Sequence, residues 1–168
     1  MTPRFRKFAL TVHVTTSVGW LGAVAGSLAL AIAGLTSQDA ETVRAVYIAL
    51  ELTGWFLLVP LSLASLLTGI VQALGTRWGL FRHYWVLAKL LINLVATIIL
   101  LLYTQTLGSL ADVARDTTEV RGAPSPVLHA GAGLLLLLGA TVLAVYKPRG
   151  VTPYGQRKQR EQGPPSQL

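Results

Sequence analysis

The sequence predicts an all-α integral membrane protein: a four-helix transmembrane bundle in which successive helices run up and down. Hydrophobic residues make up 52% of the 168 residues and charged residues only 12%, whereas an ordinary soluble domain carries about 25% charged residues. Four long apolar runs follow one another along the chain, and each approaches or exceeds the roughly 20 residues that a membrane span needs. Short connections join the runs, which favours antiparallel neighbours.

The predicted helices occupy residues 8–34, 44–74, 84–107 and 126–146, so residues 1–146 form one transmembrane domain. The first run follows three basic residues, as a secretory signal would. It is nearly double the about 7–15 apolar residues of a signal sequence, so we expect a retained helix. Pro60 predicts a kink in the second helix. Residues 147–168 are polar and basic, and they predict a tail that is disordered or lies on the anionic cytoplasmic leaflet.

Basic residues alternate with the apolar runs along the chain. They precede the first run, separate the second from the third, and fill the tail: Arg4, Arg6, Lys7, Arg77, Arg82, Lys147, Arg149, Arg157, Lys158 and Arg160. By the positive-inside rule both ends of the chain are expected on the cytoplasmic side of the membrane. Membrane topology thus explains the net charge of +7 without nucleic acid as a partner. The chain has no cysteine, which excludes disulfides and thiol chemistry.

Ionisable residues inside the predicted helices are candidates for function, because they are costly in a membrane. His13 and Lys89 each lie about 10 Å beyond the last basic residue before their helix, at the helical rise of 1.5 Å per residue. They are therefore expected at matching depth in the inner leaflet. Glu51 and His129 both fall toward the outer side, so we expect them in the same bundle interior, bonded to one another.

Polar residues form stripes on the first and third predicted helices. The stripes are His13, Thr16, Ser17, Trp20 and Ser27 on one, and Trp85, Lys89, Asn93 and Thr97 on the other. Their spacing of three or four residues keeps each set on one face. Two such stripes in an apolar bundle are expected to face inward and make a polar core site. Two other interpretations stay open. Lys89 could lie near enough to the interface for its ammonium to extend to water, and His13 could make a purely structural hydrogen bond.

Small residues give a separate signal on the first helix. Gly22 and Gly26 match the small-residue motif at which membrane helices pack closely. The same motif serves packing inside one bundle and pairing between chains, and here we favour packing inside the bundle.

The polar residues also carry a family resemblance. The segment from His13 to Gly22, with Trp20 seven residues after the histidine, resembles the first helix of the HemJ-type protoporphyrinogen oxidases and of CopD-like copper resistance membrane domains. The segment from Trp85 to Lys89 resembles the Trp…Lys motif in the third helix of the HemJ type. The ending from Val145 to Gly150 looks like a group of small four-helix membrane proteins of actinobacteria. The extra His129, Glu51 and the long tail depart from the HemJ pattern.

The resemblance to the HemJ type implies b-type haem, with His13 as its axial ligand and Lys89 as the functional partner. Trp20 and Trp85 belong to the same motifs. The resemblance to CopD-like domains implies copper handling, but Cu(I) prefers sulfur ligands that the predicted helices lack. Histidines alone suit Cu(II), and His13 and His129 are expected in opposite leaflets, so copper ranks third.

A different class of function ranks equal with haem binding: a non-catalytic scaffold, or a subunit that pairs with a membrane protein or with its own copy. No nucleophile–base arrangement is visible in the sequence. Any reaction would therefore depend on a cofactor, and whether the protein is an enzyme stays open.

Overall fold

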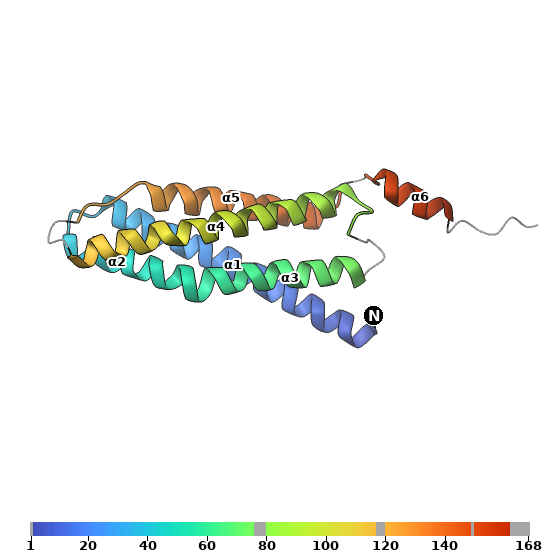
Figure 1. Cartoon of the computed structure of the whole chain (residues 1–168), viewed down its shortest axis with the longest axis horizontal. Coiled ribbons are helices and arrows are strands. Elements are labelled where there is room, and N and C mark those ends of the chain that lie inside the picture. Colours follow the sequence, from blue (N-terminus) through green and yellow to red (C-terminus); the bar gives the residue numbers. More distant parts are fainter. Residues whose placement is uncertain (1, 76–79, 117–119, 149, 162–168) are drawn as a thin grey trace, which may run out of the picture.

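Four long apolar helices account for most of the chain, which confirms the predicted all-helical membrane class. The computed structural model describes residues 2–75, 80–116, 120–148 and 150–161. Its helices are α1 (Pro3–Thr36), α2 (Ala40–Thr53), a π-helical segment η1 (Gly54–Leu58), α3 (Val59–Gly75), α4 (Tyr84–Asp116), α5 (Ser125–Tyr146) and α6 (Pro153–Glu161). Helix α2, the π segment and α3 follow one another without a break and make up the second span (Figure 1).

The helices begin and end where capping groups are available. Helix α1 starts five residues before the predicted start, because Pro3 suits the first helical position and the Thr2 hydroxyl accepts from the Phe5 N–H. Asp39 caps α2 by accepting from the Glu41 and Thr42 N–H groups. These bonds, with one from the Thr42 hydroxyl that is the largest cause, hold the pKa of Asp39 below its ordinary value.

The second span changes its winding just before Pro60. A proline inside a helix lacks a backbone donor and crowds the preceding turn. Here the five residues Gly54–Leu58 widen into a π-helix, in which the Val59 N–H donates to the Gly54 carbonyl. Such π segments are one of the identifiable causes of irregular helices.

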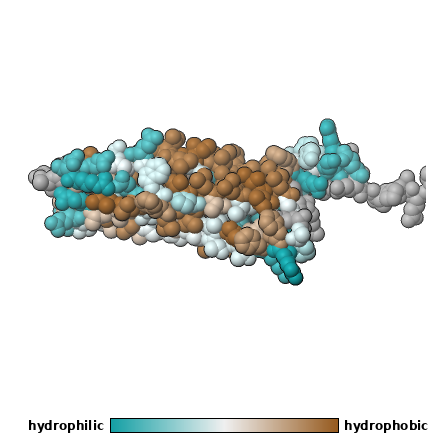
Figure 2. Space-filling view, turned by 60° about the horizontal axis from the view of Figure 1, so that its bottom comes forward, coloured by the Kyte–Doolittle hydropathy of each residue, from teal (hydrophilic) through white to brown (hydrophobic). Residues whose placement is uncertain are grey.

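The four spans pack side by side around two hydrophobic clusters. Helix α1 contacts α2, α3 and α5, while α4 contacts α2, α3 and α5 (Figure 1). One cluster surrounds Tyr47 and Leu107, and the other surrounds Trp20 and Leu137. Large apolar side chains also cover the outside, so that a hydrophobic middle separates hydrophilic ends on the face in Figure 2. This surface suits a lipid bilayer, as expected of a multi-pass membrane protein.

One end of the bundle is closed by the connection between α4 and α5. The buried Tyr47 hydroxyl donates to the Arg121 carbonyl at 3.0 Å and accepts from the Ala123 N–H at 2.6 Å. Gly122 packs against the end of α1, where an added Cβ would lie 2.4 Å from the Gly34 carbonyl oxygen. Only glycine therefore allows this loop to approach α1 so closely.

The opposite end carries the start of α1 and the helix α6 (Figure 1). Within the tail, which the sequence predicts to be disordered or to lie on the cytoplasmic leaflet, residues Pro153–Glu161 form α6. Thr152 joins α6 to the bundle: its hydroxyl donates to the Phe81 carbonyl at 2.5 Å, and its N–H donates to the Arg82 carbonyl at 3.0 Å. Arg77, Arg149 and residues 162–168 lie outside the described residues.

Candidate functional site

The candidate site is a polar cluster that α3 organises between α1 and α4. Its centre is Ser65, which is 1% exposed. The Ser65 hydroxyl lies 2.8 Å from the Ser17 hydroxyl of α1 and accepts from the Asn93 side-chain amide of α4 at 3.3 Å. Side chains from three helices thus meet at one point in an otherwise apolar interior. This arrangement satisfies groups that would be costly if they were unpaired in a membrane.

His13 joins this cluster one helical turn closer to the termini. Its Nδ1 lies 3.1 Å from the Thr68 hydroxyl oxygen. That hydroxyl donates its own proton to a backbone carbonyl, that of Ala64 at 2.6 Å or that of Ser65 at 3.3 Å. Thr68 must therefore accept from His13, which puts the imidazole proton on Nδ1. The neutral ring then carries a free lone pair on Nε2.

Gly69 gives the His13 ring its place beside α3. A Cβ at position 69 would come within 3.2 Å of the ring carbon Cε1. That distance is shorter than ordinary van der Waals contact, so the ring lies close against the backbone of α3. A side chain at position 69 would push the imidazole away from Thr68.

Lys89 lies near this cluster but does not bond to His13. Its ammonium lies 6.0 Å from the centre of the Trp85 ring, within the range of a cation–π contact. It also interacts electrostatically with His13 and with Lys147 at the end of α5. Helices α1 and α4 are not packed as direct neighbours, because α3 lies between them. His13 and Lys89 therefore border one polar region from two sides.

Several buried polar atoms around the cluster have no hydrogen-bond partner among the described residues. They are the Gln72 Nε2, the Asn93 Oδ1, the Thr97 Oγ1 and the Trp20 Nε1. Gln72, Asn93 and Thr97 lie within about one turn of the bonded residues on α3 and α4, so unused donors and acceptors surround the cluster. Buried polar groups are usually paired, and unpaired ones at a site are open to bind water or a ligand.

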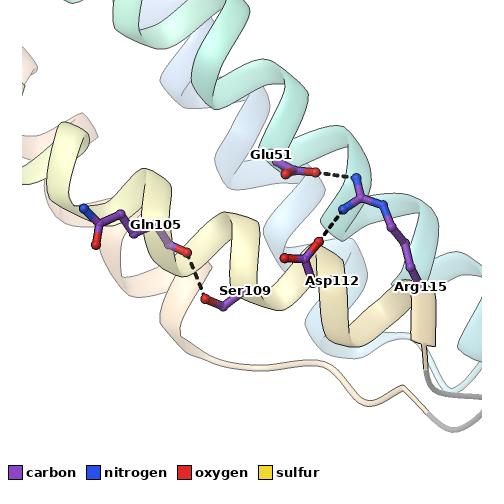
Figure 3. A network of polar contacts seen from close by, with 5 residues as sticks. All are labelled: Glu51, Gln105, Ser109, Asp112 and Arg115. Carbon is purple, nitrogen blue, oxygen red and sulfur yellow. Dashed lines mark hydrogen bonds and ion pairs between the residues drawn. The ribbon is translucent and has the colours of Figure 1, made fainter.

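The other end of the bundle holds a separate ionic cluster on the surface (Figure 3). Glu51 of α2 bonds to Arg115 of α4 at 2.5 Å, and Arg115 also bonds to Asp112 at 2.9 Å. Ser109 donates to the Gln105 carbonyl one turn away. Sequence reasoning missed Arg115 as a partner, because the third span was expected to end at Leu107. Helix α4 continues to Asp116 and brings Arg115 level with Glu51.

The expected bond between Glu51 and His129 is not formed. His129 stacks on Tyr103 of α4, with ring centres 3.7 Å apart, and its Nδ1 donates to the Ser125 carbonyl at 2.9 Å. Helices α2 and α5 do not pack against one another in the described part of the chain. Depth was a poor guide here, because two residues at one depth can lie on faces that point in different directions.

The Gly22 and Gly26 pair was expected to serve packing inside the bundle, but its face of α1 is open. Among the residues that the structure describes, a Cβ at either position would meet nothing within 4 Å. The pair therefore does not serve packing inside the bundle. Gly131 and Gly133 of α5 do serve it, since their added Cβ atoms would contact Leu28 and Val24 of α1.

Only part of this site could be predicted from the sequence. His13, Ser17 and Asn93 were expected to face inward, and their partners on α3 were not identified. A stripe of Ser62, Ser65 and Thr68 at spacings of three residues was the signal that could have found them. Within the described residues, no group of three or more histidine and acidic side chains could hold a metal ion.

Comparisons with known proteins identify no relative. No family model, no curated protein and no solved structure matches the chain.

Proposed function

We propose that the chain is a multi-pass protein of the bacterial plasma membrane that binds b-type haem, with His13 as the axial ligand. In this proposal the four spans run up and down, and both ends of the chain lie in the cytoplasm. His13 and Lys89 then lie in the inner leaflet. The basic residues at the end where α1 begins and α6 lies support this orientation.

The contact between the His13 Nδ1 and the Thr68 hydroxyl, which leaves the lone pair of the neutral ring on Nε2, is the observation that carries the proposal. Haem iron takes a neutral imidazole, and ligating histidines usually donate their other ring proton to a fixed acceptor. Thr68 is such an acceptor, at 3.1 Å from Nδ1. A single imidazole lone pair at His13 is the donor that supports the proposal. A buried histidine with both nitrogens bonded would not have fitted.

Lys89 and the two tryptophans would complete the surroundings of the haem. A lysine ammonium suits a haem propionate, and Lys89 borders the same polar region as His13. Trp85 lies beside that ammonium. Trp20 lies two turns along α1 from His13 and is 3% exposed. When bound, haem supplies one-electron chemistry. The residues of the chain orient the ligand and shield the group from water.

Copper handling has less support from the same geometry. His13 contacts α3, whereas His129 lies against Tyr103 on the opposite side of the Trp20 cluster. The two histidines do not converge on one ion, and the spans contain no cysteine. A Cu(I) site would need soft ligands that are absent from these helices.

The absorbance spectrum of protein purified from haem-replete cells tests the haem proposal. Wild-type protein should show a Soret band and sharp b-type bands when reduced. His13→Ala should lose most of that absorbance, because a methyl group cannot bind iron. His129→Ala is the matched control, since His129 also lies in a span and also donates its Nδ1 proton to a neighbour. The control should keep the bands.

Two further results decide the interpretation of the spectrum. Thr68→Val should weaken haem retention, because the imidazole loses the acceptor that fixes its tautomer. Colourless wild-type protein, or equal spectra for His13→Ala and His129→Ala, would overturn the proposal.

A scaffold or partner subunit is the second candidate function, and the open Gly22 and Gly26 face favours it. Small residues that no part of the bundle covers allow a second helix to approach closely. Substitution of Gly26 by Ile should then abolish cross-linked dimers or complexes in membranes. Gly139, which is equally open on α5, provides the control.

A further inference from the structure

The start of α4 and the end of α5 meet at the end of the bundle that carries α6 (Figure 1). The chain that follows α5 joins the two helices, because the Tyr84 N–H donates to the Gly150 carbonyl at 3.4 Å. An added Cβ at Gly150 would lie 3.4 Å from the Tyr84 ring, so the contact is close. The end of α5 therefore lies beside the first turn of α4, and we call this place the α4–α5 junction.

Lys89 directs its ammonium toward the α4–α5 junction. Side chains on a helix lean toward its N-terminus. The Lys89 ammonium accordingly lies 6.0 Å from the centre of the Trp85 ring, one turn nearer the start of α4. Lys147 follows the last residue of α5, and the two ammonium groups repel one another. Two cations from neighbouring helices therefore share the junction.

No acidic side chain of the described residues offsets these two charges. The described acidic residues at the opposite end of the bundle are Asp39, Glu41, Glu51, Asp112 and Asp116. The remaining one, Glu161, is paired with Lys158 at 2.9 Å. Neither the Lys89 nor the Lys147 ammonium has a hydrogen-bond or ion-pair partner in the described part of the chain. Like charges at one site disfavour one another, so an anion between them would stabilise the junction.

The backbone at Lys147 is a second, independent observation. Its φ of 45° is the only positive φ of a residue other than glycine in the part of the chain that the structure describes. This left-handed position after a helix usually carries glycine, because a Cβ is strained there. A lysine here lowers stability relative to glycine, and only its side chain can offset that cost through a further contact. The strained backbone thus points to a role for the ammonium.

The position of the junction identifies the anion. Lys89 belongs to a membrane span, and its neighbours Tyr84 and Trp85 are aromatic residues of the kind that lie at lipid headgroups. Toward the middle of the bundle, α4 and α5 expose large apolar side chains, among them Leu91, Val142 and Val145. A phospholipid would place its phosphate at the lysines and its acyl chains along such side chains. An acidic protein in the aqueous phase would not reach an ammonium within a span.

We propose that Lys89 and Lys147 together bind the phosphate of an anionic phospholipid from the surrounding leaflet. Lysine binds phosphate as a point charge, and basic sites between membrane helices bind lipid headgroups. The phosphate bridges α4 and α5 and separates the two positive charges. The proposal does not depend on haem at His13. An ammonium has three donors, so Lys89 can serve a phosphate and a haem propionate together.

Native mass spectrometry of the full chain, released from a neutral detergent, tests this site. The probes are phosphatidylglycerol and phosphatidylcholine with identical acyl chains, added together at equal concentration. The wild-type protein should retain phosphatidylglycerol about 25-fold more than phosphatidylcholine, because each of two lysines contributes about fivefold. Lys89→Met keeps the length of the side chain and removes its charge. The preference of this variant should fall to about fivefold.

Lys147→Gly gives the sharpest test, because its stability and its lipid preference should not change together. Glycine adopts the left-handed backbone without strain, so the lipid-free variant should unfold at the wild-type temperature or above it. Its preference for phosphatidylglycerol should nevertheless fall to about fivefold. Lys7→Met is the matched control, since Lys7 is an exposed lysine near the start of α1, at the same end of the bundle. This control should bind both lipids as the wild type does.

Three outcomes would overturn the proposal. The first is equal retention of the two lipids by the wild-type protein. The second is an equal loss of preference in Lys7→Met, Lys89→Met and Lys147→Gly, which indicates diffuse attraction to the whole basic end. The third is displacement of phosphatidylglycerol by an equal concentration of inorganic phosphate, which shows that the junction takes a free anion and not a lipid.

Discussion

Tyr47 illustrates how one buried hydroxyl can hold a loop at the end of a membrane bundle. It is 4% exposed and bonds both the Arg121 carbonyl and the Ala123 N–H. The Tyr47→Phe variant keeps the ring but leaves both backbone groups without a partner. We expect a loss of about 1–3 kcal/mol in the free energy of unfolding. Thermal unfolding of the purified protein in detergent measures it.

The matched control for this prediction is Tyr146→Phe. Tyr146 is 79% exposed at the end of α5, so its hydroxyl should contribute little to stability. If the two variants unfold at the same temperature, the Tyr47 bonds do not hold the loop in place.

At the same scale, the sequence could predict which side chains face inward but not which atoms meet. Helical spacing puts Ser17 and Asn93 on inward faces. It does not show that Ser65 joins them, since serine is common in membrane helices. The unpaired Trp20 N–H is harder still to foresee. Whether an indole finds an acceptor depends on its rotamer and on the neighbouring helix, and neither follows from spacing.

At the scale of elements, most differences between the predicted and the observed helix ends arise because the helices are longer than their hydrophobic spans. The apolar run that ends near Leu107 predicts where the lipid core ends. Helix α4 continues to Asp116 because Ala111 and Ala114 remain buried against α2. Hydropathy cannot predict this extension, since a water-facing helix end is as polar as a loop. Arg115 becomes a helical partner of Glu51 only because of it.

Among the elements, the position of α6 depends on Thr152. It caps α6 by accepting from the Gly155 N–H at 3.1 Å, and it also bonds the Phe81 carbonyl. The Thr152→Val variant removes both bonds. It should weaken the attachment of α6 by about 0.5–2 kcal/mol, the usual cost of a lost helix cap. Faster trypsin cleavage after Arg157 and Lys158 would measure this change.

Thr141→Val serves as the control for this cleavage assay. The Thr141 hydroxyl donates to the Leu137 carbonyl within its own helix, and among the described residues it makes no bond to α6. Cleavage of the tail in this variant should match the wild type. Equal cleavage in all three proteins would mean that Thr152 does not hold α6.

At the scale of the whole molecule, the number of spans was predictable and the pairing of side chains across the bundle was not. Each span is recognised by summed hydrophobicity, which does not depend on its neighbours. The bond expected between Glu51 and His129 depended on the rotation of two helices about their axes. That rotation is set by packing of side chains such as Tyr103 against the His129 ring.

The orientation of the bundle in the membrane gives the last prediction, and the absence of cysteine makes it simple to test. Gln38 and Gln156 are both exposed, at opposite ends of the bundle. Each can be replaced by cysteine as the only thiol in the chain. With both termini in the cytoplasm, an impermeant maleimide should label Gln38→Cys on intact spheroplasts. It should label Gln156→Cys only after the membrane is opened. The basic residues around Gln156, Arg157 and Lys158 among them, are the physical reason, because such residues are retained on the inner side. The reverse pattern would place the termini outside, and His13 with them in the outer leaflet.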